Sequence, residues 1–242
     1  FVNDEIALIN TKNRFVLGKY NKLNYDYLIV ALGAELEPEL VPGLAEGSYN
    51  LCDLESVERL KSAVEEIKKG TVLIAISSVP FKCPPAPYEY AFLIEEILRK
   101  RAVRKDVRII VTTPESQPMP VAGKLVGDQV LRMLAQRGIE FLPEHKPKSV
   151  DFPRKAVLYE NRPIVDYDIL AAMPPHRAPK PVRDSGLADP SGFVPADLYT
   201  LRTVVPRVFA VGDIASLKLP NGKPHPKAGV FAEEHGKTAA KI

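Results

Sequence analysis

The chain has 242 residues, of which 45% are hydrophobic, and this share is sufficient for a globular core. Its 33 basic and 30 acidic residues give a net charge of +3, which excludes the strongly basic surface that a nucleic-acid groove needs. The two cysteines exclude a disulfide scaffold, and the longest apolar runs are of strand length, well below the roughly 18 residues of a membrane span. We therefore expect a folded chain with no nucleic-acid partner.

Apolar runs and amphipathic patterns alternate along most of the chain. The predicted elements are, in chain order, an alternating strand segment at 5–17, a strand at 27–34, a helix at 54–69, a strand at 71–77, a helix at 88–104, a strand at 107–112, a helix at 124–137, a strand at 139–142, a β meander at 148–163, strands at 164–173 and 208–213, and a helix that begins near residue 227. Because alternating strands and helices require a parallel sheet with crossover connections, the sequence predicts an α/β fold. The run at 27–34 is apolar throughout, which predicts a strand covered on both faces.

The clearest chemical motif is the apolar strand that ends in Gly212 and Asp213. A carboxylate at the end of such a strand lies at the carboxyl edge of the sheet, where open α/β folds bind ligands. There Asp213 can accept hydrogen bonds from sugar or ribityl hydroxyls. Ala228 and Gly229 open the next helix, whose N-terminal N–H groups favour an anion or an electron-rich ring. The competing interpretation is that Asp213 only caps a turn.

Residues 208–213 resemble the second flavin motif of the flavoproteins that have two dinucleotide-binding domains. Residues 25–33 resemble the strand of the same group that is written Y-D-x-L-V-x-A-T-G, with Leu32 where threonine is common. The resemblance implies an FAD site. Its FAD-binding positions correspond to Ala31, Gly33, Gly212, Asp213, Lys227, Ala228 and Gly229. A cation at Lys227 would favour electron density on a reduced flavin, and the competing interpretation is a plain surface lysine.

The loop at 79–89 departs from a nicotinamide-binding turn. A pyrophosphate site there would have the pattern G-x-G-x-x-G, because only glycine lets the backbone approach the pyrophosphate closely enough. This loop has no glycine and contains four prolines, which have no N–H to donate. We therefore expect that NAD does not bind at this loop.

Cys83 lies in this loop, beside Lys82 and just before a predicted helix. A neighbouring cation and a helix N-terminus both lower the pKa of a thiol and favour the thiolate. The loop resembles the proline-flanked cysteine of the flavocytochrome c sulfide dehydrogenases and related sulfide:quinone oxidoreductases, which implies that Cys83 lies near the flavin and carries sulfur. By the same resemblance, Glu89 is an acid/base residue. The competing interpretations are a buried small hydrophobe for Cys83 and an ordinary first-turn glutamate for Glu89.

Cys52 is the other cysteine of the chain. Sulfide:quinone oxidoreductases often have a cysteine at a comparable position, so the resemblance implies a second catalytic cysteine here. An incidental buried cysteine is the competing interpretation.

The four histidines have no metal-ligand spacing, and we expect no metal site. His225 lies in the loop before the last helix, where it would face the flavin ring or the substrate. We expect solvated surface positions for the other three, which are His145, His176 and His235.

Complete members of the family begin with a strand, a G-x-G-x-x-G turn and a helix, and this chain contains no such pattern. We therefore expect an internal fragment, without an N-terminal and a C-terminal segment of the family, that binds FAD weakly or not at all. The implied fold has two Rossmann-like domains with parallel sheets. They are a divided and partial FAD-binding-type domain at 1–45 and 161–242, and an inserted second dinucleotide-binding-type domain at 46–160.

By this resemblance, the complete enzyme oxidises sulfide or a related sulfur species and passes electrons through FAD to quinone or a cytochrome, whereas the fragment alone is inactive. Two alternatives stay open: an NAD(P)H-linked disulfide or quinone reductase of the same superfamily, and a non-catalytic scaffold that retains the fold. A homodimer, a peripheral membrane contact through a C-terminal segment, and a cytoplasmic or periplasmic location also stay open.

Overall fold

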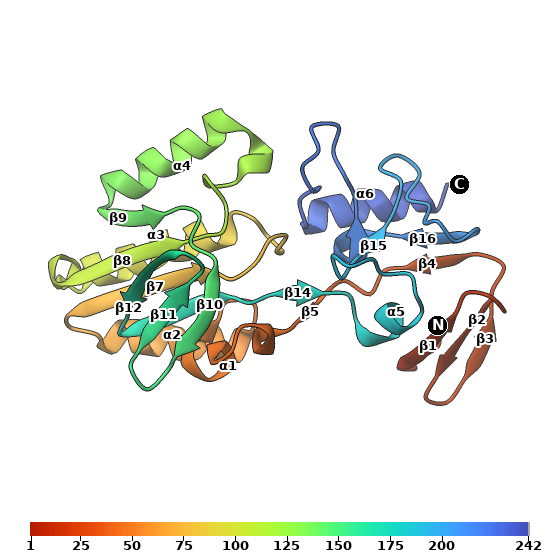
Figure 1. The fold of residues 1–242 in the computed structure, drawn as a ribbon, viewed down its shortest axis with the longest axis horizontal. Helices are drawn as coiled ribbons and strands as arrows, with labels where there is room; N and C mark the ends of the chain where they lie inside the picture. Colours follow the sequence, from red (N-terminus) through yellow and green to blue (C-terminus); the bar gives the residue numbers. More distant parts are fainter. Residues whose placement is uncertain (242) are drawn as a thin grey trace. The chain divides into compact units, whose positions relative to one another are not determined.

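The computed structural model describes residues 1–241 and divides the chain into two compact units (Figure 1). The inner unit is Glu37–Pro175, and the outer unit joins Phe1–Leu36 to the segment that begins at His176. Residues 37–45 and 161–175, which we expect in the flavin-type domain, pack with the inner unit. The reason is hydrogen bonding, because Val150 N donates to Pro42 O and the strand at 169–173 joins the inner sheet.

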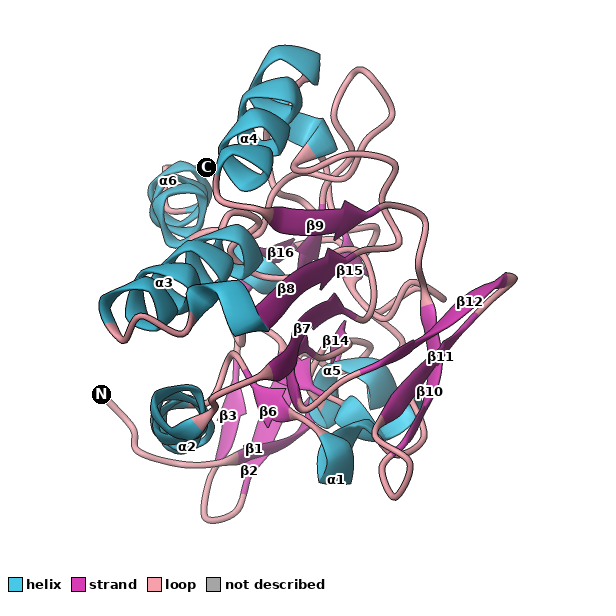
Figure 2. Cartoon of the chain, turned by 90° about the vertical axis from the view of Figure 1, so that its left-hand side faces the viewer, coloured by secondary structure: helices cyan, strands magenta, loops and turns pink. Residues whose placement is uncertain are grey.

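The inner unit is built on a five-stranded parallel sheet with the order β6-β13-β7-β8-β9. The strands are β6 (Tyr49–Asn50), β7 (Gly70–Ile76), β8 (Val107–Thr112), β9 (Ile139–Leu142) and β13 (Ile169–Met173). One face carries the helices α2 (Leu54–Glu66), α3 (Ala86–Lys100) and α4 (Lys124–Gln136), and the other carries the antiparallel strands β10 (Pro147–Asp151), β11 (Ala156–Tyr159) and β12 (Arg162–Asp166) (Figure 2). Short helical segments complete the unit: η1 (Pro38–Leu40), α1 (Leu44–Gly47), η2 (Arg104–Asp106) and η3 (Pro120–Ala122). The predicted α/β fold with a parallel sheet is confirmed.

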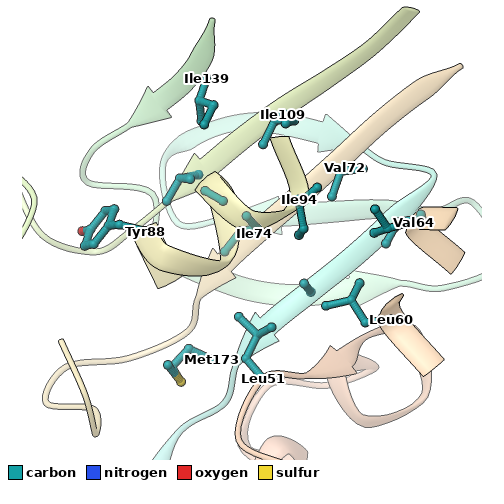
Figure 3. Close-up of a cluster of buried hydrophobic side chains, with 14 of the residues drawn as sticks. Leu51, Leu60, Val64, Val72, Ile74, Tyr88, Ile94, Ile109, Ile139 and Met173 are labelled. Atoms are coloured by element: carbon teal, nitrogen blue, oxygen red, sulfur yellow. The ribbon is translucent and has the colours of Figure 1, made fainter. Parts of the chain in front are cut away.

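Side chains of the central strands alternate between two cores, because successive residues of a strand point to opposite faces of a sheet. Val72 and Ile74 of β7 pack in the core beneath the helices, where Ile94 of α3 also lies (Figure 3). Leu73 and Ala75 of the same strand pack in the core beneath the meander. Burial on both faces explains why β7 is apolar over residues 72–76.

The outer unit is built from small sheets. Its strands are β1 (Ile6–Asn10), β2 (Phe15–Gly18) and β3 (Lys22–Asn24) in an antiparallel sheet, β4 (Leu28–Val30) parallel to β16 (Val208–Ala210), β5 (Glu35–Leu36) antiparallel to β14 (His176–Arg177), and β15 (Val194–Pro195) parallel to β17 (Ala215–Ser216). Its helical segments are α5 (Lys180–Asp184), η4 (Gly212–Ile214) and α6 (Gly229–Ala239). Val211 N donates to Val30 O, so the chain leaving β4 and the chain leaving β16 run side by side.

Two strand predictions are wrong in detail. The strand expected at 27–34 forms only at Leu28–Val30, and Ile29 is 44% exposed rather than covered. Among the described residues β4 has one neighbouring strand, β16, and no packed layer covers the face that carries Ile29. The strand expected at 164–173 is divided, because β12 ends at Asp166 in the meander and β13 begins at Ile169 in the inner sheet. Within residues 1–241 we find no helix that is long and apolar enough to cross a membrane.

Candidate functional site

Five of the residues predicted to bind FAD line one pocket in the outer unit, with a volume of about 200 Å³. Ala31 and Gly33 follow β4, Gly212 and Asp213 follow β16, and Gly229 begins α6. Parallel strands end at the same edge of a sheet, and at that edge these three distant segments of the chain meet. The structure thus brings together most of the predicted flavin-binding residues.

The pocket is open where a cofactor would need space. A Cβ atom added at Gly33 or at Gly229 would meet no heavy atom within 4 Å, so both glycines border free volume. Gly33 also has a φ of +65°, in the left-handed region that favours glycine. Ala228 is the N-cap of α6 and forms no side-chain cap there, so the first N–H groups of the helix keep their donor capacity.

Asp213 is partly buried and lines the same pocket. Within residues 1–241, no side chain or backbone N–H donates a hydrogen bond to its carboxylate, and η4 has no side-chain cap. The interpretation of Asp213 as a turn cap is therefore wrong for this part of the chain. Its carboxylate remains available to accept hydrogen bonds from a ligand.

Lys227 is only 5% exposed, so the interpretation of a plain surface lysine is wrong. Its Nζ atom donates to Asp213 O at 2.6 Å and to Ala215 O at 3.1 Å. Burial lowers the pKa of Lys227 to about 8, and the negative charge of Asp213 opposes this effect. Lys227 and Ala228 both line a smaller cavity beside the pocket. Through its two hydrogen bonds Lys227 also stabilises the turn that carries Asp213.

His235 of α6 contributes a contact that the sequence analysis missed. Its Nδ1 atom accepts a hydrogen bond from Gly212 N at 3.2 Å, and the side chain is partly buried rather than solvated. The sequence signal for this contact is helical spacing, because Ala228, Ala232 and His235 recur at intervals of three or four residues and share one face of α6. Ala232 also lies against Gly212, with 3.2 Å between its Cβ atom and a Cβ added at that glycine.

His176 and His145 also differ from the surface positions expected for them. His176 is buried in β14, and His145 is partly buried with its ring edge-on to Tyr159 at 5.1 Å. His225 lies beside the flavin-type pocket, with its ring centre 5.2 Å from that of His235. In the described part of the chain, no three His, Cys, Asp or Glu side chains are grouped so that they could hold a metal ion.

A second group of predicted residues lies in the inner unit, around the start of α3. Cys83 is exposed, so the buried alternative is wrong, and its φ of +56° turns the loop just before the helix. Its backbone oxygen accepts from Ala86 N at 2.9 Å, which ties the loop to the first residue of α3. Glu89 is exposed in the first turn of the same helix.

Cys52 is partly buried near this group, with its Sγ atom 3.1 Å from the Sδ atom of Met173. Burial raises the pKa of the Cys52 thiol, while the charge of Lys82 lowers it and the charge of Cys83 raises it. The thiols of Cys52 and Cys83 are therefore close enough to influence each other electrostatically.

Tyr90 is a further residue of this group that the sequence analysis missed. Burial raises the pKa of its hydroxyl, and the nearby charges of Cys52, Cys83 and Glu89 raise it further. The hydroxyl donates to Leu51 O at 3.1 Å. The three residues predicted to be catalytic thus share one neighbourhood around Tyr90, which we call the thiol cluster.

Comparison with known proteins finds similar flavoproteins. Residues 57–174 match the model of a family described as the central part of the flavoprotein chain of flavocytochrome c sulfide dehydrogenase. The chain is similar to the sulfide:quinone oxidoreductases. It is 28% identical to the mitochondrial sulfide:quinone oxidoreductase of Mus musculus over 230 residues, which is 90% of this chain and 51% of the mouse protein. The corresponding protein of Dictyostelium discoideum is 29% identical, over 90% of this chain and 50% of its own length.

The fold of a solved sulfide:quinone oxidoreductase agrees with these relationships. The enzyme of Aquifex aeolicus matches with a TM-score of 0.85 and 24% identity, over 100% of this chain and 59% of that enzyme. The resemblance to the sulfide:quinone oxidoreductases and sulfide dehydrogenases that the loop and strand motifs indicate is confirmed. The chain spans about half the length of the curated relatives that it matches.

Proposed function

We propose that this chain carries the flavin-contacting and thiol-bearing parts of a flavin-dependent enzyme that oxidises sulfide or a related sulfur species. The observation that carries the proposal is the pocket lined by Ala31, Gly33, Gly212, Asp213 and Gly229, in a chain related to sulfide:quinone oxidoreductases. In this proposal quinone or a cytochrome accepts the electrons.

The residues of the pocket fit the ring and ribityl end of FAD. Asp213 provides a carboxylate acceptor for ribityl hydroxyls, and no described residue occupies that acceptor. The N-terminus of α6 provides N–H groups and a positive dipole end, which favour the electron density of a reduced ring. Gly33 and Gly229 leave the space that a flat aromatic ring needs.

The thiol cluster fits the handling of sulfur. Cys83 is exposed at a loop with Lys82 as its neighbour and α3 directly behind it, and this surrounding favours a thiolate. A thiolate is the form that bonds to an electrophilic sulfur atom. Cys52 is less exposed, and burial raises the pKa of its thiol, which disfavours the thiolate. Cys83 is therefore the better nucleophile of the pair.

In the proposed reaction, the sulfur atom of hydrosulfide forms an S–S bond with the thiolate of Cys83 to give a persulfide, the S–H bond of hydrosulfide breaks with release of its proton, and two electrons pass to an acceptor. FAD supplies the two-electron acceptor when it is bound, and quinone or a cytochrome removes the electrons afterwards. Glu89, exposed one turn along α3, is placed to take up the proton.

Absorbance spectroscopy tests the proposal. A full-length protein that contains this chain is loaded with FAD, and its spectrum is recorded anaerobically, before and after addition of sulfide near neutral pH. Loss of the flavin absorbance band on sulfide addition, with its return when a soluble quinone is added, is the expected result. Retention of the band over minutes at millimolar sulfide would refute the proposal.

A further inference from the structure

The turn that carries Asp213 is held from one side by α6. Gly212 has a φ of +71°, and its amide N–H donates to Nδ1 of His235 at 3.2 Å. Gly212 and Asp213 line the pocket, whereas His235 lies behind them in the adjoining smaller cavity. His235 therefore touches the turn without lining the proposed flavin pocket itself.

We propose that His235 is a positioning residue, which holds the Gly212–Asp213 turn in its ligand-binding shape and makes flavin affinity depend on pH. The inference rests on the proposed function, since it assigns a role to His235 at the same pocket. Its basis is the direction of the hydrogen bond. An imidazole nitrogen accepts a hydrogen bond only through its lone pair, so the bond requires neutral His235 with its proton on Nε2.

The surroundings of His235 keep it neutral. Burial lowers its pKa, as do the charges of His225 and Lys227, while the negative charge of Asp213 acts in the opposite direction. His225 and Lys227 face it from the loop before α6, and Asp213 faces it from η4. On α6 itself, Glu234 and Lys237 pair with each other at the surface. The bond to Gly212 is thus present at neutral pH and is lost as the pH falls through the lowered pKa of His235.

Protonation has a definite consequence for the turn. An Nδ1–H group would face the Gly212 N–H, so two donors would meet where one donor and one acceptor met before. The amide would have to turn away, and Asp213 is the next residue along the chain. Because Asp213 supplies the carboxylate of the pocket, we expect weaker flavin binding at low pH.

Two variants of His235 and one control variant separate positioning from simple packing. His235→Asn places an amide oxygen close to the position of Nδ1 and does not titrate, and its helix propensity is similar to that of histidine. His235→Leu removes the acceptor and keeps a side chain of moderate size. His145→Gln is the control, since His145 lies in the inner unit and contacts Tyr159.

The first readout needs no flavin. Nuclear magnetic resonance follows the Gly212 amide of the chain from pH 7.5 to 5. We expect its chemical shift to titrate together with the His235 ring in the wild type and in His145→Gln, and to stay constant in His235→Asn. A Gly212 amide that does not respond while the His235 ring titrates would overturn the inference, whether or not FAD binds.

The second readout is FAD affinity, measured by flavin fluorescence over the same pH range on a full-length protein that contains this chain. The loss of one hydrogen bond corresponds to a change of about fivefold in affinity. We expect about that loss for the wild type on acidification, the same loss for His235→Leu already at pH 7.5, and a flat profile for His235→Asn. Equal pH profiles for the wild type and His235→Asn would also overturn the inference. Failure of every variant to bind FAD at any pH would count against the proposed function instead, and the amide titration would still decide the role of His235.

Discussion

The Nζ atom of Lys227 lies 3.7 Å from the centre of the Phe193 ring, inside the outer unit. An ammonium group over an aromatic face is attracted by the electrons of the ring, which partly offsets the cost of burying the charge. The same atom donates to the backbone oxygens of Asp213 and Ala215. Phe193 and the two carbonyls thus form a cage that fixes Lys227 beneath the Asp213 turn.

This cage predicts a pH dependence of stability. The pKa of Lys227 is lowered from 10.5 to about 8, so the native state releases this proton at lower pH than the unfolded chain does. The free energy of unfolding of the wild type should therefore rise between pH 8 and 10.5, relative to Lys227→Met, by on the order of 3 kcal/mol. Urea denaturation of both proteins at pH 7.5, 9 and 10 measures this difference. Parallel pH profiles for the two proteins would contradict it.

Gly212→Ala should damage both stability and the pocket. The φ of +71° disfavours any side chain, and the added Cβ atom would lie 3.2 Å from Cβ of Ala232. We expect a loss of about 1–3 kcal/mol in the free energy of unfolding, with weaker FAD binding. Gly236→Ala on α6 is the control, since a Cβ atom there meets nothing within 4 Å, and it should stabilise the protein by about 0.5–1 kcal/mol. Thermal unfolding compares the two variants.

Arg101 closes the C-terminal end of α2 from another helix. Its guanidinium donates to Val64 O at 2.8 Å and to Ile67 O at 2.9 Å, where α2 has no further N–H groups to offer. Arg101→Met should lower the free energy of unfolding by about 1–3 kcal/mol, because two backbone oxygens lose a charged donor. Lys105→Met, at an exposed position nearby in the sequence, should change it by less than about 0.5 kcal/mol. Similar losses in both variants would show that the capping bonds contribute little.

The two cysteines should differ in reactivity. Cys83 is exposed, whereas burial raises the pKa of Cys52, so iodoacetamide at pH 7 should modify Cys83 at least about tenfold faster. Mass spectrometry of peptides measures both rates in one sample. Faster modification of Cys52 would reverse the assignment of the nucleophile.

Cys83→Ser should separate folding from sulfur chemistry. The substitution keeps the volume of an exposed side chain, so the melting temperature should change little. In a full-length protein that contains this chain, sulfide-dependent flavin reduction should fall at least about a hundredfold, since serine cannot hold sulfur in its place. If the variant keeps most of the wild-type rate, Cys83 has no part in the chemistry.

NADH should not reduce the flavin of a full-length protein that contains this chain at a useful rate. The loop between β7 and α3 has no glycine, and Pro84, Pro85 and Pro87 remove N–H groups around the helix start that would bind a pyrophosphate. Stopped-flow absorbance with micromolar NADH, and with sulfide as the positive control, tests this expectation. Rapid bleaching by NADH would favour the NAD(P)H-linked alternative.

The sequence by itself determined those helices, strands and loops that are recognisable from the pattern of their own residues. The continuous apolar run at 72–76 in β7 and the helical period of α2 follow from which residues are apolar, and the glycine-free loop is visible as composition. The positions of Gly33, Gly212 and Gly229 were also predictable, because parallel strands end at a common edge and these residues follow strands or begin a helix.

Only the tertiary structure decided where single side chains are buried and what they contact. Lys227 and His235 look like surface residues in the sequence, because a charged or polar residue in a loop or short helix gives no local sign of the carbonyls or the amide that it meets. The exposure of Ile29 could not be predicted either, since an apolar strand has the same pattern whether or not a second layer packs on it. The electrostatic proximity of Cys52 and Cys83 likewise depends on the pairing of distant strands, which brings their loops to one edge of the inner sheet.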